Sequence, residues 1–317
     1  MKIVVFESLA VAEKKLREIA KPLTDAGNEL ILYDKTDDIN LQKERVSDAD
    51  ILVIANMPLK GEVIKAAERL KYLSIAFTGF DHVDLGICKE KNIKVSNAAG
   101  YATVAVPELV FGSLISLLRS IVPLDKDTRD SGSKANSRQE EIYGKKFGII
   151  GTGLIGSRTA KIALAFGATV LAQSNHENEE LKSLGVKYCS LDELLKESDF
   201  ISVSTPLTPS TKNLINKEKI ALMKKNAIVI NTARGPVVDN EALAEALKAG
   251  KIGGACIDVY DKEPPLDKDF SLLSAPNTVL TPHIGFATEE AMVRRAHIVF
   301  DDNITGYLKG DHVNKVI

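Results

Sequence analysis

The sequence of 317 residues is poor in cysteine and has almost no excess of either charge. Its three cysteines, Cys88, Cys189 and Cys256, are odd in number and show no CxxC or CxxH spacing. Neither a disulfide framework nor a zinc site is therefore expected, and we predict three buried thiols and no bound metal. The formal charge is −2 at pH 7. Without a basic stripe, binding to nucleic acid or to an acidic membrane surface is not expected.

Long hydrophobic runs are also missing. No segment approaches the roughly 18 consecutive apolar residues of a membrane-spanning helix. The N-terminus, residues 1–7, is a short apolar stretch that reaches an acid at Glu7. It does not resemble a signal peptide, so we expect a cytoplasmic protein with no membrane contact. The length favours about two domains.

Short apolar runs alternate with helix-like segments through most of the chain. In the first part the runs cover residues 3–6, 30–33, 51–54, 73–76 and 93–96. In the second part they cover residues 147–150, 168–172, 186–189, 200–204, 227–231 and 254–258. Such alternation predicts an α/β protein with parallel sheets covered by amphipathic helices.

The stretch at residues 146–160 combines a buried strand, a glycine turn and the start of a helix. Gly151, Gly153 and Gly156 form the pattern GxGxxG directly after the apolar run. The first glycine permits a tight turn, the second allows a pyrophosphate to approach the backbone, and the third allows close packing of helix and strand. The free N–H groups of the helix start favour the anion. This stretch therefore predicts dinucleotide binding, and the first 98 residues contain no such pattern.

Two segments lie between the halves. Residues 104–119 are apolar on nearly all sides, which predicts a helix buried between domains or against another subunit. Residues 125–145 are polar and contain glycine and serine, which predicts an exposed loop.

Candidate site residues follow the apolar runs of the second half. Ligands of parallel sheets bind beyond the carboxyl ends of the strands, so Thr205, Pro206, Thr232 and Asp258 are expected to line a cofactor site. The three side chains best suited to acid–base chemistry and to binding a carboxylate are Arg234, Glu263 and His283. An arginine can hold a carboxylate through two hydrogen bonds. A histidine can transfer a proton near neutral pH, and a glutamate beside it stabilises the charged imidazole.

Taken together, these motifs resemble the D-isomer-specific 2-hydroxyacid dehydrogenases. The resemblance rests on residues 78–84, 100–108, 151–156, 231–235, 258–264 and 281–285, in that order along nearly the whole chain. It implies two doubly wound parallel-sheet domains, with a Rossmann cofactor domain at residues 99–287 inserted in a flavodoxin-like substrate domain. The substrate domain would comprise residues 1–98 and 288–317, with the active site in the cleft between the domains.

The resemblance also implies roles for individual residues. Arg234 would bind the carboxylate and carbonyl of a 2-oxo acid, His283 would donate the proton, and Glu263 would orient and charge His283. The substrate-binding residues would be Thr78, Gly79, Arg234 and His283. Asp258 would lie near the nicotinamide carboxamide. The full set of expected cofactor contacts is Gly151, Gly153, Leu154, Ile155, Gly156, Ser174, Thr205, Pro206, Thr211, Thr232, Ala233, Arg234, Asp258, His283 and Gly285. The apolar helix at residues 104–119 would form much of a homodimer interface.

The sequence departs from the family pattern at two positions. Ser174 stands where an acid usually holds the adenosine ribose, about 20 residues past the glycines. Losing this acid removes both an acceptor for the 2′-hydroxyl and the repulsion of a 2′-phosphate, and no arginine follows it. Either NAD(H) or NADP(H) is therefore a possible cofactor. Ser204 replaces a histidine of many relatives, which affects contacts on the adenine side.

These features predict NAD(P)-dependent reduction of a small 2-oxo acid to the D-2-hydroxy acid and the reverse reaction. Hydroxypyruvate or glyoxylate is the first choice of substrate, from residues 79–84 and 101–103. Glu263 argues against a formate dehydrogenase, in which the residue paired with histidine is glutamine. The end of the sequence at Ile317 argues against a phosphoglycerate dehydrogenase with a C-terminal regulatory domain, although a short form stays open. The alternative from another class is a corepressor-like protein that senses nicotinamide nucleotides without turnover.

Overall fold

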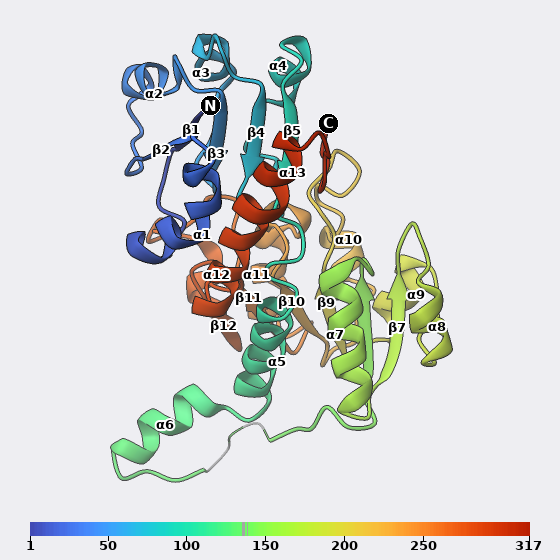
Figure 1. Ribbon diagram of the computed structural model, residues 1–317. Coiled ribbons are helices and arrows are strands. Elements are labelled where there is room, and N and C mark those ends of the chain that lie inside the picture. The colour runs from blue at the N-terminus through green and yellow to red at the C-terminus, as the bar shows by residue number, and fades with distance from the viewer. Residues whose placement is uncertain (135–136, 138) are drawn as a thin grey trace. The chain divides into compact units, whose positions relative to one another are not determined.

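A computed structural model describes residues 1–134, 137 and 139–317, which form two compact units. Unit 1 comprises Met1–Ala102 and Ala287–Ile317, and unit 2 comprises Thr103–Phe286. Each unit contains one sheet in which every strand pair is parallel (Figure 1). The predicted α/β fold with two parallel-sheet domains is confirmed.

The sheet of unit 1 has five strands in the order β2-β1-β3-β4-β5, which is the flavodoxin-like order. Its strands are β1 (Lys2–Val5), β2 (Glu29–Leu32), β3 (Ile51–Ile54), β4 (Tyr72–Ile75) and β5 (Lys94–Asn97). The helices that connect these strands are α1 (Glu13–Asp25), α2 (Ile39–Val46), α3 (Gly61–Ala66) and α4 (Leu85–Glu90). Strands β1 and β3 are adjacent, so the chain reverses its direction of travel across the sheet between them.

The C-terminal segment completes unit 1. It consists of α12 (Glu289–His297), the π-helical turn η3 (Ile298–Ile304) and α13 (Thr305–Leu308). Val299 and Phe300 are buried in one core with Ile3 and Ile51 of the sheet. The buried Asn303 side chain donates to Ser74 Oγ at 3.2 Å and to a carbonyl oxygen of β5 at 2.9 Å. Apolar burial and these hydrogen bonds fix the segment on the sheet.

The sheet of unit 2 has seven strands in the order β12-β11-β10-β9-β6-β7-β8, which contains the Rossmann order. Its strands are β6 (Lys146–Ile150), β7 (Thr169–Gln173), β8 (Lys187–Tyr188), β9 (Phe200–Val203), β10 (Ile228–Asn231), β11 (Gly254–Ile257) and β12 (Thr278–Leu280). Its helices are α5 (Ala105–Leu118), α6 (Ile121–Arg129), α7 (Leu154–Ala165), α8 (Glu179–Ser183), α9 (Leu191–Glu197), α10 (Lys217–Ile220) and α11 (Asn240–Lys248), with short 3₁₀ turns η1 (Gly235–Val237) and η2 (Ser271–Ser274).

Helix α5 packs into the core of unit 2, whereas its apolar composition was expected to reflect burial between domains or against another subunit. Phe111 lies 5.5 Å from the ring of Phe147 and 5.2 Å from that of Phe166, and Phe147 lies 5.9 Å from Phe200. Burial of one such side chain contributes roughly 1.5–3 kcal/mol. The cluster therefore anchors α5 to β6, the strand that leads into the glycine turn.

The prediction of a loop over residues 125–145 is wrong for its first part, because α6 continues to Arg129. The helix has no buried residue, and Arg129 pairs with Asp125 one turn earlier at 2.9 Å. Such i, i+4 pairs support exposed helices that polarity alone would suggest are loops. Residues 135, 136 and 138 of this prediction lie outside the described residues.

No single helix among the described residues is both long and apolar enough to cross a membrane. The bent pair α5 and α6 passes that test only when the two helices are counted together. All three cysteines are free, but only Cys88 and Cys256 are buried. Cys189 is partly exposed, which corrects the prediction of a third buried thiol. Burial raises the pKa of Cys88 to about 11 and that of Cys256 to about 12.

Candidate active site

The predicted site residues of unit 2 follow one row of paired strand ends. In the register of the sheet, the residues Leu280, Ile257, Asn231, Val203, Ile150 and Gln173 lie side by side on neighbouring strands. The next residues along each strand are Thr281, Asp258, Thr232, Ser204, Gly151 and Ser174. With strands about 4.8 Å apart, six strands form an edge about 24 Å long. The residues that follow these strand ends are therefore held side by side by one rigid sheet.

The glycine turn lies at the switch point between β6 and β9. Gly151 has φ +92°, and a Cβ there would lie 2.7 Å from the carbonyl oxygen of Ser204. A Cβ on Gly156 would lie 1.9 Å from the carbonyl oxygen of Gly151. A Cβ on Gly153 would meet no heavy atom within 4 Å among the described residues. The space before α7 is therefore open at the one glycine where a pyrophosphate needs access, so the residues present fit a dinucleotide.

Leu154 and Ile155 form the first residues of α7, and Leu154 is 63% exposed. An exposed leucine at a helix start beside a glycine turn offers an apolar contact to a ligand. The first N–H groups of this helix have no partner within the helix itself. This end of α7 can therefore bind an anion.

The segment after β7 is attached to the glycine turn by hydrogen bonds. Tyr188 Oη donates to Thr152 Oγ1 at 3.0 Å and accepts from Asn178 N at 2.9 Å. The Asn178 amide donates to Ser157 Oγ at 3.3 Å, and Ser157 Oγ donates to the Thr152 carbonyl at 2.8 Å. Ser174, at the start of this segment, is partly exposed.

Two hydroxyl groups are buried at the next strand ends without a partner in the described part of the chain. They are Ser204 Oγ after β9 and Thr232 Oγ1 after β10. A buried hydroxyl without a hydrogen bond is unfavourable, and a ligand that supplies a partner removes this cost. Thr205 and Pro206 follow Ser204, and Thr211 Oγ1 donates to the Pro206 carbonyl at 2.6 Å, which closes the loop.

The turn after β10 positions Arg234. The side chain of the buried Asn231 accepts from Ala233 N at 3.1 Å and donates to the Arg234 carbonyl at 3.0 Å. One guanidinium N–H of Arg234 donates to the Ala233 carbonyl at 2.7 Å. A Cβ on Gly235 would lie 2.0 Å from the carbonyl carbon of Tyr260, so this turn packs directly on the loop after β11.

The carboxylate of Asp258 holds the loop that carries His283. Asp258 is 2% exposed and accepts hydrogen bonds from Thr281 Oγ1 at 2.6 Å, Ile284 N at 2.9 Å and Gly285 N at 2.8 Å. Burial raises the pKa of Asp258, although these hydrogen bonds act in the opposite direction. Burial also raises the pKa of Tyr260, to about 12, and its hydroxyl donates to the Thr281 carbonyl at 3.0 Å.

His283 adopts φ +56°, an uncommon conformation for a residue with a side chain. The loop bonded to Asp258 imposes this conformation. His283 Nδ1 lies 3.0 Å from Glu263 Oε1, and the imidazole meets the ring of Phe286 edge to face at 5.2 Å. The His283 side chain is 16% exposed and that of Glu263 is 49% exposed. The carboxylate of Glu263 therefore engages Nδ1 of the imidazole and can orient the ring.

Unit 2 contains Arg234, Glu263, His283 and all the predicted cofactor contacts, and it places Glu263 and His283 3.0 Å apart. Thr78 and Gly79 belong to unit 1, where they follow β4 and the Thr78 carbonyl accepts from Asn97 Nδ2 at 2.7 Å. Asn231 belongs to the motif at residues 231–235, but its supporting role and that of Tyr188 were not predicted from the sequence. An Asn at a strand end before a turn is a signal that could have found the first.

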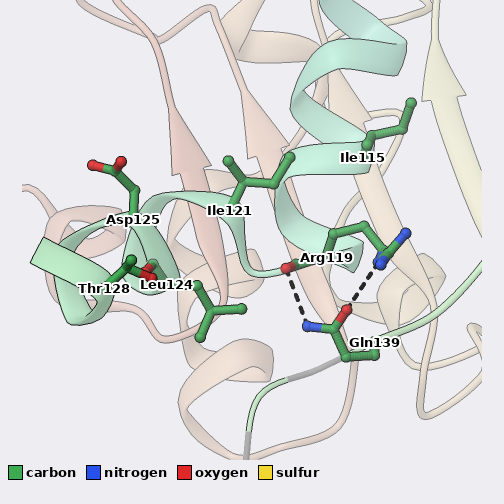
Figure 2. Close-up of a pocket in the computed structure, with 7 residues that line it drawn as sticks. All are labelled: Ile115, Arg119, Ile121, Leu124, Asp125, Thr128 and Gln139. Carbon is green, nitrogen blue, oxygen red and sulfur yellow. Dashed lines mark hydrogen bonds between the residues drawn. The ribbon is translucent and has the colours of Figure 1, made fainter. Parts of the chain in front are cut away.

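Among the described residues, no group of three or more His, Cys, Asp or Glu side chains could hold a metal ion. Figure 2 shows a pocket at α5, α6 and the segment that follows, and the predicted catalytic residues are not among those that line it. Its lining residues are Ile115, Arg119, Ile121, Leu124, Asp125, Thr128 and Gln139. Arg119 and Gln139 bond to each other through side chain and backbone, at 2.9 and 3.3 Å.

Comparison with known proteins identifies the family. Residues 111–285 match the model of the D-isomer specific 2-hydroxyacid dehydrogenase NAD binding domain. Hydroxypyruvate reductase from Thermotoga maritima is 41% identical over 252 residues, covering 78% of this chain and 82% of the relative. D-3-Phosphoglycerate dehydrogenase from Methanocaldococcus jannaschii is 39% identical over 278 residues, covering 86% of this chain. The match spans only 52% of that relative's length.

Solved structures agree with this match. D-Lactate dehydrogenase from Aquifex aeolicus, in complex with NAD and lactic acid, has a TM-score of 0.86 and 31% identity, with 98% of this chain and 96% of that chain covered. An acyclic imino acid reductase (Bsp5) in complex with NADPH and D-Arg has a TM-score of 0.90 and 29% identity over the full length of both chains. With the glycine turn and the histidine–glutamate pair on one sheet edge, these matches show that the chain belongs to the D-isomer-specific 2-hydroxyacid dehydrogenase family, whose members are oxidoreductases that use nicotinamide cofactors.

Proposed function

We propose that this protein reduces a small 2-oxo acid to the D-2-hydroxy acid with NAD(P)H and also catalyses the reverse reaction. The observation that carries the proposal is the 3.0 Å contact between His283 and Glu263 on the sheet edge that also bears the glycine turn. An imidazole–carboxylate pair of this kind can transfer a proton at one end of a cofactor site. The relatives named as reductases and dehydrogenases support the same reaction class.

Each of the three residues has a defined task in the proposed mechanism. The nicotinamide, when bound, supplies or accepts the hydride at its C4 atom. Arg234 binds the substrate carboxylate through its guanidinium and polarises the neighbouring carbonyl. His283 donates a proton to the carbonyl oxygen during reduction and removes it during oxidation. Glu263 orients the imidazole and stabilises its charged form, and Asp258 fixes the loop behind it.

The two units take different tasks in this proposal. Residues 99–287 act as the cofactor domain, and residues 1–98 with 288–317 act as the substrate domain. Thr78 and Gly79 of the substrate domain bind the carboxylate of the substrate through their backbone. The residues that hold the cofactor are those of the glycine turn and of the strand ends described above.

Hydroxypyruvate or glyoxylate is the substrate that we favour. The Thermotoga maritima relative named hydroxypyruvate reductase and the resemblance of residues 79–84 and 101–103 to glycerate dehydrogenase-type members support this choice. A short phosphoglycerate dehydrogenase is the second candidate, because the Methanocaldococcus jannaschii relative carries that name.

A panel of 2-oxo acids with NADH and NADPH, followed by nicotinamide absorbance, tests the proposal. The panel contains hydroxypyruvate, glyoxylate, pyruvate and 3-phosphohydroxypyruvate. We expect the highest kcat/KM with hydroxypyruvate or glyoxylate, and the D-enantiomer as product on chiral chromatography. A clear preference for the phosphorylated acid would favour the second candidate. No turnover of any acid with either cofactor would contradict the proposal and support nucleotide sensing without catalysis.

We further propose a homodimer formed by α5 and α6. Helix α6 has no buried residue: Ile121, which lines the pocket of Figure 2, is 49% exposed, and Val122 is 67% exposed. Exposed apolar side chains next to a pocket are typical of an interface. Light scattering on the 34.4 kDa chain is expected to give twice the chain mass, and Val122→Glu is expected to weaken the dimer. A monomeric wild-type protein would contradict this proposal.

A cytoplasmic location is also proposed and can be tested by cell fractionation.

A further inference from the structure

We propose that His82 is a positioning residue for the substrate. It holds the turn at residues 78–81, which we call the carboxylate turn, in the conformation that binds a 2-oxo acid. The inference rests on the proposed function, in which Thr78 and Gly79 bind the substrate carboxylate, and it adds the residue that supports them. All the groups that carry it belong to unit 1.

The carboxylate turn follows β4 at the carboxyl edge of the five-stranded sheet. Thr78 is exposed, and Phe80 is 39% exposed. Within the part of the chain that the structure describes, the backbone N–H groups of Thr78 and Gly79 donate no hydrogen bond. Two consecutive donors of this kind suit an anion when the turn holds them in a fixed direction. The contacts at the two ends of the turn therefore decide how well it binds.

The start of the carboxylate turn is attached to β5. The Thr78 carbonyl accepts from Asn97 Nδ2 at 2.7 Å, and the Phe77 carbonyl accepts from Ala98 N at 3.0 Å. Phe77 itself is 5% exposed. This end of the turn therefore continues the rigid sheet.

The other end of the carboxylate turn is attached through His82. Its Nε2 atom lies 2.9 Å from the Ala55 carbonyl oxygen, and because a carbonyl can only accept, Nε2 carries the proton. The His82 carbonyl accepts from Leu59 N at 3.0 Å. The imidazole also meets the ring of Phe77 edge to face at 6.4 Å. Phe77 and His82 flank the turn in sequence, so this ring contact closes the turn at its base.

The segment that receives the His82 hydrogen bond is itself fixed. It follows β3, and the carboxylate of Glu7 accepts from Ala55 N and Met57 N, each at 2.9 Å. Glu7 is 5% exposed and Met57 is 1% exposed. Because this segment is anchored in the core, a hydrogen bond to it restrains His82 and the turn before it.

Loss of this hydrogen bond should affect binding of the acid more than the chemical step. Without it, the carboxylate turn stays attached to β5 but samples more conformations, so its two N–H groups must be ordered when the acid binds. His283, the proposed proton donor, belongs to unit 2 and keeps its own contacts. We therefore expect a higher KM with little change in kcat, which is the pattern of a lost binding contribution.

The test compares two amides at position 82. The amide nitrogen of glutamine can take the place of Nε2, whereas that of asparagine, which is one methylene shorter, does not reach the Ala55 carbonyl. His82→Asn is expected to raise KM for glyoxylate about tenfold or more, with kcat within about threefold of the wild-type value. His82→Gln is expected to keep KM within about threefold of the wild-type value. Equal KM values in the two variants, with circular dichroism showing folded proteins, overturn the inference.

His312 provides the matched control. Its Nε2 also contacts a backbone carbonyl of unit 1, that of Val95 at 3.2 Å, but His312 belongs to the C-terminal segment. His312→Asn should keep the wild-type KM and kcat, and thermal unfolding compares its loss of stability with that of His82→Asn. A KM raised equally in both variants would reflect general destabilisation and would overturn the role of His82.

Calorimetry with oxalate in the presence of NADH separates this inference from the proposed function. Oxalate is a dicarboxylate that resembles a 2-oxo acid and is not reduced. His82→Asn should bind oxalate about tenfold more weakly than the wild-type protein and bind NADH with unchanged affinity. If the wild-type protein reduces glyoxylate and His82→Asn loses no affinity for either acid, only the inference fails. If no 2-oxo acid is reduced but oxalate binding depends on His82, only the proposed reaction fails. A wild-type protein that neither reduces a 2-oxo acid nor binds oxalate overturns both.

Discussion

Both sheets have a switch point where the strand order reverses, next to β1 in unit 1 and next to β6 in unit 2. The groups at the carboxyl ends of these two strands differ. In unit 1 the chain leaves β1 into a turn where Glu7 is 5% exposed, and Glu7 Oε1 accepts from Ala55 N and Met57 N, each at 2.9 Å. In unit 2 the chain leaves β6 into Gly151, and the space in front of Gly153 is open. The first sheet fills its carboxyl edge with its own carboxylate, whereas in the second no heavy atom of the described residues fills the space at Gly153.

This difference explains why only one of two similar sheets is expected to bind a dinucleotide. Backbone N–H groups at a switch point attract an anion in either fold. Glu7 satisfies those of the β3 turn internally, so a pyrophosphate would have to displace a buried carboxylate. In unit 2 the glycines remove the side chains that would occupy the same space. Strand order alone therefore does not make a cofactor site. A ligand can bind at the carboxyl edge only where no side chain of the protein already fills it.

The largest effect is expected where the open edge carries the proton donor. We predict that His283→Ala lowers kcat by about 10²- to 10⁴-fold because the general acid is lost. Binding of NADH, measured by fluorescence, should change little. Unit 1 offers a matched control, since His297 pairs with Asp301 at 2.7 Å in a similar geometry on its surface. His297→Ala should keep wild-type kcat. Equal activity of the two variants would remove His283 from the proposed mechanism.

The next effect concerns the open space itself. We predict that Gly153→Ala folds normally, because its Cβ has room, but binds NADH about tenfold or more weakly because the methyl group occupies the path of the pyrophosphate. Gly156→Ala should instead lower stability, because its Cβ would lie 1.9 Å from a backbone oxygen. Calorimetry and thermal unfolding separate the two outcomes. Undiminished NADH affinity in Gly153→Ala would contradict the proposed position of the cofactor.

Much of unit 2 could be predicted because its signals are local. Each apolar run ends within a residue of its strand, so Thr232 and Asp258 were placed at the sheet edge directly from the sequence. The spacing of glycines determined the turn at Gly151 in the same way. The resemblance paired Glu263 with His283, and the structure places their side chains 3.0 Å apart.

What could not be predicted depends on contacts between distant residues. Glu7 looked like an acid that ends a strand, but its partners lie 48 and 50 residues away. Asp258 was expected beside the nicotinamide, and its carboxylate proves to accept three hydrogen bonds from a loop more than 20 residues later. Helix α6 was missed because no burial supports it. Composition does not record which distant N–H group a carboxylate will meet.

A smaller effect is expected from the filled edge of unit 1. We predict that Glu7→Ala lowers the free energy of unfolding by about 1–3 kcal/mol, because two buried N–H groups lose their acceptor. Affinity for ADP-ribose should be unchanged, since unit 2 contains the glycine turn. Chemical denaturation measures the free energy of unfolding, and calorimetry measures the affinity for ADP-ribose. Loss of nucleotide affinity in a folded Glu7→Ala variant would contradict the assignment of separate tasks to the two edges.

The smallest effect is expected at the opposite, amino edge, where the two units are alike. Asp50 accepts from Lys2 N at 2.8 Å and pairs with Arg69, and Asp199 accepts from Lys146 N at 2.8 Å and pairs with Lys224. Asp50 directly precedes β3, which pairs with β1, and Asp199 directly precedes β9, which pairs with β6. Burial acts to raise the pKa of both carboxyl groups, but the hydrogen bonds and the cations outweigh it and leave both below the usual value.

A lowered pKa in the folded protein means that each carboxylate stabilises the fold above its unfolded pKa of about 3.9 and that this contribution is lost as the pH falls through the lowered value. Asp50→Asn and Asp199→Asn should therefore each cost about 1 kcal/mol or less at pH 7 and make the loss of stability below about pH 4 shallower. Urea unfolding at pH 7 and across the acid range measures both. The aspartate makes the same kind of contacts in both sheets, so the two variants should lose stability to a similar extent. Substitutions at the carboxyl edges, by contrast, should have different effects in the two units. If the free energy of unfolding of either variant fell as steeply below about pH 4 as that of the wild-type protein, its aspartate would not stabilise the first strand through an ionised carboxylate.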